Sequence, residues 1–331
     1  MTHHTKMIAA ACIASFGLSV SAFAQETTLR LHTLVQDPHP YNDMAAFMGE
    51  QIAERTDGEI EIQLFNAAQL GDDPSVIGEM GLGTIDLMIS STNNATRQVP
   101  EYQIFSIPYL FAGFDDLMGR VGPGTPAEAY FRDVYADRGL DMQLLALGGS
   151  GTRNMSNRIG PVESLDDIQG IQMRTPPSPM ISETWAELGT LPVSVAWGEL
   201  YGAIQTGVAD GLESSIAGYS GSRLYEVAPY LAMTGHTIQV NHISMSDRAW
   251  NRLTDEQKAI FLEVAAEASA YGIDQARMYE TELVETLQSE NGVTVTYPDI
   301  SEFQDRLSDL QATLVTDMEL EPAQEALFSD N

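Results

Sequence analysis

Residues 28–65 read TLRLHTLVQDPHPYNDMAAFMGEQIAERTDGEIEIQLF and decide the fold class. Apolar and polar residues alternate over 28–34 and again over 59–65, which is the period of a β-strand with one buried face. The apolar residues of the segment between them recur at helical spacing: Met44, Phe47, Met48 and Ile52. The stretch therefore predicts a strand, a helix and a second strand.

Strands and helices continue to alternate toward the C-terminus. Periodicity predicts helices over 74–82, 180–188 and 197–206, and strands over 85–90, 141–147, 171–175 and 293–297. We expect residues 212–215 to form a turn before a further helix. A β-α-β-α-β series implies a largely parallel sheet that helices cover on both faces. The predicted fold class is therefore α/β.

One predicted helix is much longer than the others. Thr254 and Gln257 form a capping-box pattern at its start, and apolar residues recur at helical spacing toward Leu287. A helix of ~30 residues is ~45 Å long, which is enough to run across two lobes. No long flexible linker or internal repeat separates the α/β units, so we expect the two units to be closely coupled.

The N-terminus has the layout of a secretory signal peptide. A weakly basic start precedes an apolar run over 7–22, and AFA at 22–24 is a small-x-small cleavage site. We expect residues 1–24 to be removed by cleavage after Ala24, which leaves a soluble chain in the periplasm. The run is too short for a membrane span, which needs ~20 apolar residues. Lipid attachment at Cys12 is the alternative, although the residues before it lack the usual Leu.

The composition is strongly acidic. The chain has 47 Asp and Glu against 16 Lys and Arg, which gives a net charge of −31 at pH 7. That balance argues against nucleic-acid partners, which bind basic patches, and against binding to anionic lipid. Such a chain also repels anions at long range. An anionic ligand would therefore need a few Arg side chains gathered in one pocket, where short fork-shaped hydrogen bonds dominate.

The sequence lacks motifs for catalysis, metal binding and cofactor binding. The six His residues have no metal-ligand spacing, and no Gly-x-Ser-x-Gly elbow or phosphate-binding glycine loop is complete. Cys12 is the only cysteine and leaves with the signal peptide, so neither a disulfide nor a cysteine nucleophile is expected. We therefore expect no catalytic residue, metal or cofactor, and a protein that is not an enzyme.

Two arginines lie where an α/β sheet binds ligands. Residues 148–151 read GGSG, which predicts a glycine-rich turn leaving a strand, and Arg153 follows it. Arg174 lies at the carboxyl end of the strand predicted over 171–175, the edge at which open α/β sheets bind ligands. An Arg there can grip a carboxylate in a bidentate fork. The alternative for each Arg is an ordinary ion pair with one of the many surface acids.

A series of short motifs runs in order along nearly the whole mature chain. They are QLG at 69–71, GTID at 83–86, IPYLF at 107–111, RNMSN at 153–157, DIQGIQMR at 167–174, ELYGAIQTGVADG at 199–211, LYEV at 224–227 and TGH at 234–236. The ordered series closely resembles the substrate-binding subunit of tripartite ATP-independent periplasmic (TRAP) transporters, of the dicarboxylate-binding (DctP) type.

The resemblance implies a periplasmic-binding-protein-like fold with two α/β lobes, a hinge and a long helix that crosses both. Lobe I would hold 25–150 plus about 239–278, and lobe II 151–238 plus about 279–331. The family closes on its ligand and delivers it to a sodium-driven membrane pair, a small and a large subunit. We expect the binding protein itself to be a monomer, without a nucleic-acid partner.

The resemblance also assigns site residues in lobe II. Arg174 matches the Arg that binds the ligand carboxylate, and Arg153 matches one that assists it. Trp197 matches an aromatic position that packs on the ligand, although core packing at a helix start is the alternative. The family commonly places Asn after Glu213, but this chain has Ser214, whose hydroxyl supplies one donor where an amide has two.

In lobe I, Asp73, Ser91 and Thr92 match positions that read the distal part of the ligand. The Ser/Thr/Asn-rich segment 90–94 suits hydroxyls or a second anionic group of the ligand. Capping of a strand end is the alternative for Ser91 and Thr92. The candidate ligands are four-carbon dicarboxylates, sugar acids such as uronates, other hydroxy or keto acids, and sulfonates, with a hydroxylated or sugar acid favoured. A sensor module for a receptor, or a secreted hydrolase, remains the alternative function.

Overall fold

The computed structural model describes residues 27–317, 322–325 and 327. The predicted signal peptide over 1–24 lies outside this range. The strands are β1 (Thr27–His32), β2 (Ile60–Phe65), β3 (Leu87–Ser91), β4 (Met142–Asn157), β5 (Gln172–Thr175), β6 (Leu191–Ser194), β7 (Gly211–Ser215), β8 (Tyr230–Ser246) and β9 (Thr294–Thr296). They form one sheet in the order β2-β1-β3-β8-β4-β7-β5-β6, and β9 pairs with β8.

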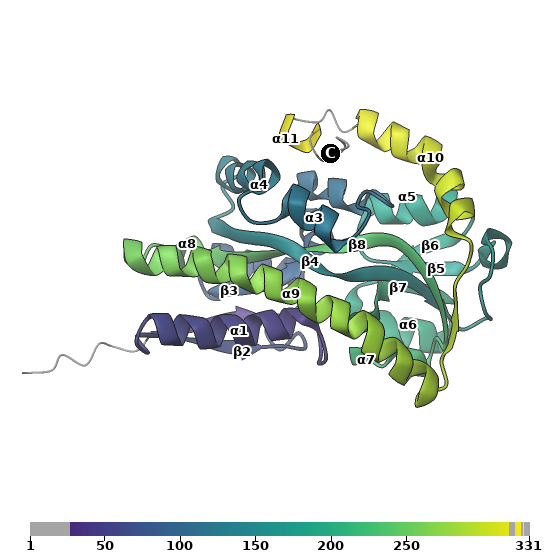
Figure 1. Cartoon of the computed structure of the whole chain (residues 1–331), viewed down its shortest axis with the longest axis horizontal. Helices are drawn as coiled ribbons and strands as arrows, with labels where there is room; N and C mark the ends of the chain where they lie inside the picture. Colours follow the sequence, from purple (N-terminus) through teal and green to yellow (C-terminus); the bar gives the residue numbers. More distant parts are fainter. Residues whose placement is uncertain (1–26, 318–321, 326, 328–331) are drawn as a thin grey trace, which may run out of the picture.

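Helices cover both faces of this sheet (Figure 1). They are α1 (Pro40–Arg55), α2 (Asp73–Gly81), α3 (Phe114–Val121), α4 (Pro126–Asp137), α5 (Pro179–Glu187), α6 (Leu200–Thr206), α7 (Ile216–Gly221), α8 (Asp247–Trp250), α9 (Asp255–Ser289), α10 (Ile300–Asp317) and α11 (Pro322–Glu325). Four clusters of buried apolar side chains fill the space between helices and sheet. The predicted α/β class and its two-lobe architecture are confirmed.

The prediction of a largely parallel sheet is wrong for the sheet as a whole. Strands β1, β2 and β3 are parallel, as are β5, β6 and β7. However, β8 runs antiparallel to both β3 and β4, and β7 runs antiparallel to β4. No strand was predicted over 230–246, although residues 238–246 (IQVNHISMS) alternate apolar and polar residues with one break at Asn241-His242. Polar and apolar residues are both buried in this half of β8. The sheet is therefore mixed.

Two long strands join the parallel parts of the sheet. The β4–β8 ladder extends from Met142 opposite Ser246 to Asn157 opposite Tyr230. Its register shifts between Gly149 and Thr152, near the middle of β4. A register shift bends and twists a strand locally. We still predict the lobe division at 150/151 and 238/239, which falls at this irregularity.

Helix α9 is the predicted long helix. It spans 35 residues, which corresponds to ~52 Å. Its capping box is formed as predicted: Gln257 N donates to Thr254 Oγ1 at 3.2 Å, and Thr254 N donates to Gln257 Oε1 at 3.0 Å. Figure 1 shows α9 crossing the sheet, and it packs against α1, β4 and α7. Helix α9 therefore contacts both predicted lobes: α1 belongs to lobe I and α7 belongs to lobe II.

The glycines predicted to form a turn lie inside β4 instead. A Cβ at Gly148 would lie 2.1 Å from Ser269 Oγ, and one at Gly149 would lie 2.7 Å from Ile273 Cδ1. Both neighbours belong to α9. The glycine pair therefore allows the long helix to lie directly on the strand, and it does not make a turn.

We predict that Gly148→Ala lowers the free energy of unfolding by ~1–3 kcal/mol, the usual cost of overpacking. The new methyl group would displace Ser269 Oγ from the hydrogen bond that it donates to Leu147 O at 2.7 Å. Urea unfolding would measure the change. Gly160→Ala is the matched control, because a Cβ there meets nothing within 4 Å. Equal midpoints for the two variants would contradict the packing argument.

Candidate ligand-binding site

A cavity brings together six of the seven predicted site residues. They are Asp73, Ser91, Arg153, Arg174, Trp197 and Ser214. The structure does not place Thr92 on this lining: its hydroxyl donates to Val240 O at 3.1 Å and is buried. The lining also contains Asn93 and Asn94 of the Ser/Thr/Asn-rich segment 90–94, and three residues that sequence analysis did not single out: His39, Tyr41 and Gln239.

Arg174 has the character of an anion receptor. It is in β5, its side chain is 1% exposed, and its Nε donates to Val195 O at 2.9 Å. No described residue accepts from its two terminal amino groups, and no described carboxylate forms an ion pair with it. Burial lowers the pKa of Arg174 to about 10, and the charge of Glu213 opposes that shift. The guanidinium is therefore cationic at neutral pH and lacks a partner anion.

Trp197 and Ser214 lie beside this guanidinium. The Trp197 ring lies under the guanidinium of Arg174, 5.7 Å from Cζ to the ring centroid. Trp197 also packs on a buried apolar cluster, so its ligand-facing and core-packing interpretations are compatible. The Ser214 hydroxyl lines the cavity without a hydrogen bond to any described residue. A Cβ at Gly218 would come 2.7 Å from that hydroxyl, so glycine there keeps it accessible.

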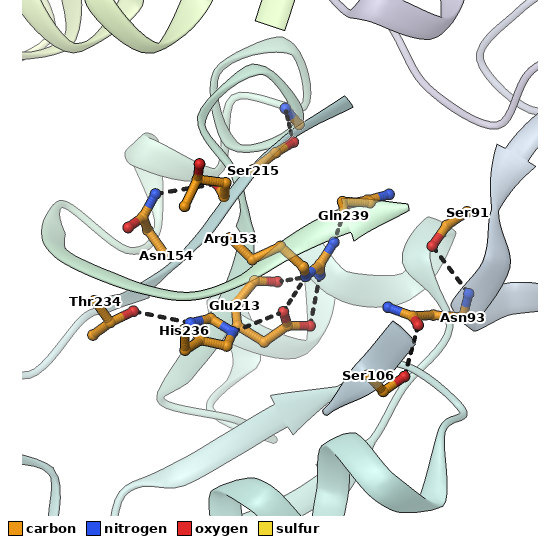
Figure 2. Close-up of polar contacts among 12 residues, drawn as sticks. Ser91, Asn93, Ser106, Arg153, Asn154, Glu213, Ser215, Thr234, His236 and Gln239 are labelled. Atoms are coloured by element: carbon orange, nitrogen blue, oxygen red, sulfur yellow. Dashed lines mark hydrogen bonds and ion pairs between the residues drawn. The ribbon is translucent and has the colours of Figure 1, made fainter. Parts of the chain in front are cut away.

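Arg153 is occupied, which differs from the expectation of an arginine free to share the ligand. Figure 2 shows its guanidinium clamped between Glu213 and Gln239. Its Nη2 donates to Glu213 Oε1 at 2.6 Å and to Glu213 O at 3.1 Å, while Nε donates to Glu213 Oε2 and Nη1 to Gln239 Oε1. Four of the five guanidinium hydrogens are thereby used. At most one N–H of Arg153 is left for a ligand.

Glu213 balances the charge of Arg153 inside the protein. Glu213 lies in β7. The segment 212–215 was predicted to form a turn, but it belongs to this buried strand. Burial alone would raise the pKa of Glu213, but the adjacent Arg153 and His236 hold that pKa well below its ordinary value. His236 Nε2 lies 3.4 Å from Glu213 Oε2, and its Nδ1 is 2.9 Å from Thr234 Oγ1 (Figure 2).

The part of the cavity wall that belongs to predicted lobe I includes three residues that sequence analysis missed: His39, Tyr41 and Gln239. His39 Nδ1 accepts from Tyr41 N at 3.1 Å, and burial, with a smaller effect of Arg153, lowers the pKa of His39 to about 3. The neutral ring therefore carries its hydrogen on Nε2. Tyr41 Oη accepts from Gln239 Nε2 at 2.7 Å, so its own hydrogen is available. In the sequence, His39-Pro40 marks only a break between the strand predicted over 28–34 and the helix that follows it.

The charges of the lining favour a single anionic group. Its charged side chains are Asp73, Arg153 and Arg174. Arg153 is paired with Glu213, and Asp73 is hydrogen-bonded to His32, so Arg174 is the cation without a counter-charge. One carboxylate fits this arrangement.

Within the described ranges, no three His, Cys, Asp or Glu side chains are grouped to hold a metal ion. None of the described helices has the length and apolar character to span a membrane.

Comparisons with known proteins agree on one family. The family described as bacterial extracellular solute-binding protein, family 7, matches residues 31–316. A solute-binding protein of Roseobacter denitrificans is 28% identical over 327 residues, which cover 98% of this chain and 97% of the relative.

Two solved structures have the same fold. A TRAP periplasmic solute-binding protein of Roseobacter denitrificans with bound β-D-glucuronate is 26% identical, with a TM-score of 0.82 over 92% of this chain and 100% of that chain. One from Bordetella bronchispeptica, with density assigned to pantoate, is 25% identical, with a TM-score of 0.85 over 92% and 100%.

We predict that Glu213→Gln lowers the free energy of unfolding by ~3–5 kcal/mol at pH 7, because it leaves the buried Arg153 charge unpaired. Since the pKa of Glu213 is lower in the folded protein, the contribution of the carboxylate is present above its ordinary value of 4.5 and is lost as the pH falls below it. The gap between wild type and variant should therefore narrow below about pH 4.5. Denaturant unfolding at several pH values measures this, with exposed Glu50→Gln as control. A gap that is small at pH 7, or that widens in acid, would contradict the pairing.

Proposed function

The chain belongs to family 7 of the bacterial extracellular solute-binding proteins, and on that premise we propose that it captures a small organic acid between its lobes for a TRAP transporter. The proposal rests on one observation: the buried guanidinium of Arg174 has no carboxylate partner among the described residues. A buried guanidinium without a carboxylate partner is costly unless an anion joins it. A ligand carboxylate supplies that anion in a bidentate geometry that only Arg offers.

We propose a hydroxylated monocarboxylic acid, such as a sugar acid, as the ligand class. One uncompensated cation matches one carboxylate, whereas a second carboxylate would approach Asp73 without a cation of its own. The remaining polar lining offers neutral donors, among them Tyr41 Oη, His39 Nε2 and Ser214 Oγ. The Roseobacter protein has bound glucuronate, and the Bordetella protein has density assigned to pantoate; both compounds are hydroxylated monocarboxylic acids. Keto acids, sulfonates and four-carbon dicarboxylates are the competing classes.

Capture requires a difference between two states of the protein. A ligand that touches both walls binds the closed arrangement better than the open one, and only that difference drives closure. Removal of water from the cavity lowers the local dielectric constant and strengthens the pairing of the carboxylate with Arg174. We expect the hinge to lie at the boundaries 150/151 and 238/239, with 25–150 plus about 239–278 in lobe I.

The same proposal places the mature chain in the periplasm, after cleavage behind Ala24. Its partners would be the small and large TRAP membrane subunits, and the binding protein would act as a monomer without catalysis. A receptor-coupled sensor would bind the same ligand, so genes for a membrane pair beside this one would favour transport. Ligand that is recovered unchanged after incubation would argue against a hydrolase.

We predict that Arg174→Gln weakens binding of the preferred acid at least ~100-fold, because loss of one partner leaves a buried carboxylate unpaired at a cost of ~3–5 kcal/mol. A thermal-shift screen of the chain from Gln25 would first rank sugar acids, keto acids, sulfonates, dicarboxylates and neutral sugars, since binding to the folded state raises Tm. Calorimetry would then compare the variants.

The matched control for that experiment is Arg97→Gln, which changes an exposed arginine away from the cavity and should leave the affinity unchanged. Near-native affinity in Arg174→Gln would disprove the carboxylate clamp. A shift with neutral sugars alone would disprove the acid as ligand.

A further inference from the structure

Asp73 is already held by the protein. Its side chain is 1% exposed at the start of α2. Oδ1 lies 3.0 Å from His32 Nε2, and because a carboxylate only accepts, the imidazole must donate. Oδ2 accepts from Asn94 Nδ2 at 2.7 Å and from the Ser90 hydroxyl. Three donors occupy its two oxygens, which leaves Asp73 about one of its four acceptor positions, on Oδ1.

These contacts fix the direction of the Asn94 amide. Its Nδ2 must face Asp73, since the reversed amide would bring a carbonyl oxygen against a carboxylate. Asn94 is partly buried and lines the cavity, and no described residue donates to its Oδ1. Asn94 therefore presents an oriented acceptor that the protein leaves unused.

The neighbouring groups are mainly donors. Asn93 Oδ1 accepts from Ser106 Oγ at 2.8 Å, which leaves the Asn93 amide hydrogens available (Figure 2). His39 offers Nε2–H on the same wall. A hydroxyl both donates and accepts, so it can satisfy the Asn94 acceptor and one of these donors at once. A second carboxylate lacks the hydrogen that Asn94 requires, and it would also meet the charge of Asp73.

We propose that His32, Asp73 and Asn94 form a positioning chain that makes Asn94 Oδ1 the reader of a ligand hydroxyl, with Asp73 acting through Asn94. The assignment rests on the proposed function, because it needs a ligand whose carboxylate lies on Arg174. It replaces the expectation that Asp73 itself contacts the distal part of the ligand. Asn94 is then the residue that separates polyhydroxy acids from simpler acids.

The test compares two ligands by isothermal titration calorimetry. One is whichever of D-glucuronate and L-galactonate binds the wild type more tightly. The other is 2-hydroxyhexanoate, which has the same number of carbons and an α-hydroxy carboxylate but no further hydroxyls. The ratio of the two Kd values is the hydroxyl preference. Asn94→Ala should reduce that preference about tenfold, the effect of one buried hydrogen bond, without changing the Kd of 2-hydroxyhexanoate.

The variant Asp73→Asn distinguishes positioning from direct contact. It should lose the preference to a similar extent, and the double variant should lose no more than Asn94→Ala alone, since both changes remove one interaction. Exposed Asn251→Ala is the control and should keep the preference. If Asp73→Asn does not fold, Asn94→Ala alone still decides whether Asn94 reads a hydroxyl.

Several outcomes would overturn the proposal. An undiminished preference in Asn94→Ala would exclude Asn94 as the reader, and losses that multiply in the double variant would mean that Asp73 contacts the ligand on its own. A wild type that lacks the preference would also refute it. Failure of the wild type to bind any acid of the thermal-shift screen would instead refute the proposed function, which is a distinguishable result.

Discussion

The pairing of Arg153 with Glu213 is the constraint on which the cavity depends. It joins two adjacent strands, β4 and β7, and removes one of the two buried arginines of the described chain from competition for an anion. Arg174 is left as the single unpaired cation, flanked by Trp197 and Ser214. Without this internal ion pair, the cavity would hold two cations and would favour a doubly charged ligand. In the proposed function, Glu213 thus determines the charge of the ligand although it does not line the cavity.

On the opposite wall of the cavity a buried acid also orients a neighbouring side chain, but that side chain, Asn94, is uncharged. Asp73 accepts three hydrogen bonds and in turn orients Asn94, just as Glu213 holds Arg153. Each wall thus has a buried acid that organises a neighbouring side chain on the cavity lining. Such supporting contacts keep the groups in place before the ligand arrives, which lowers the entropy lost on binding.

The features that could be predicted from the sequence are those that a few neighbouring residues encode. The strand over 28–34, the capping box at Thr254 and the position of Arg174 at a strand end were all predicted from a few adjacent residues. The partner of Arg153 could not be, because Glu213 is 60 positions away and any of 47 acids could have served. The strand β8 was missed although residues 238–246 alternate apolar and polar residues, because the pattern breaks at Asn241-His242 and residues 230–237 do not share it. Gly148 was predicted to form a turn. In the structure it leaves room for helix α9, which lies more than 100 residues later in the chain, to pack on β4.

Three segments pass between the two halves of the sheet: β4, β8 and α9. A relative movement of the halves would have to bend all three together, as it would bend parallel leaf springs, so a swing in one direction would be easier than twisting or sliding. Such a linkage would return its two jaws to the same alignment on every cycle. The distance between Arg174 on one jaw and Asn94 on the other would then be reproducible, and the protein would measure the length of its ligand in the way that a caliper does.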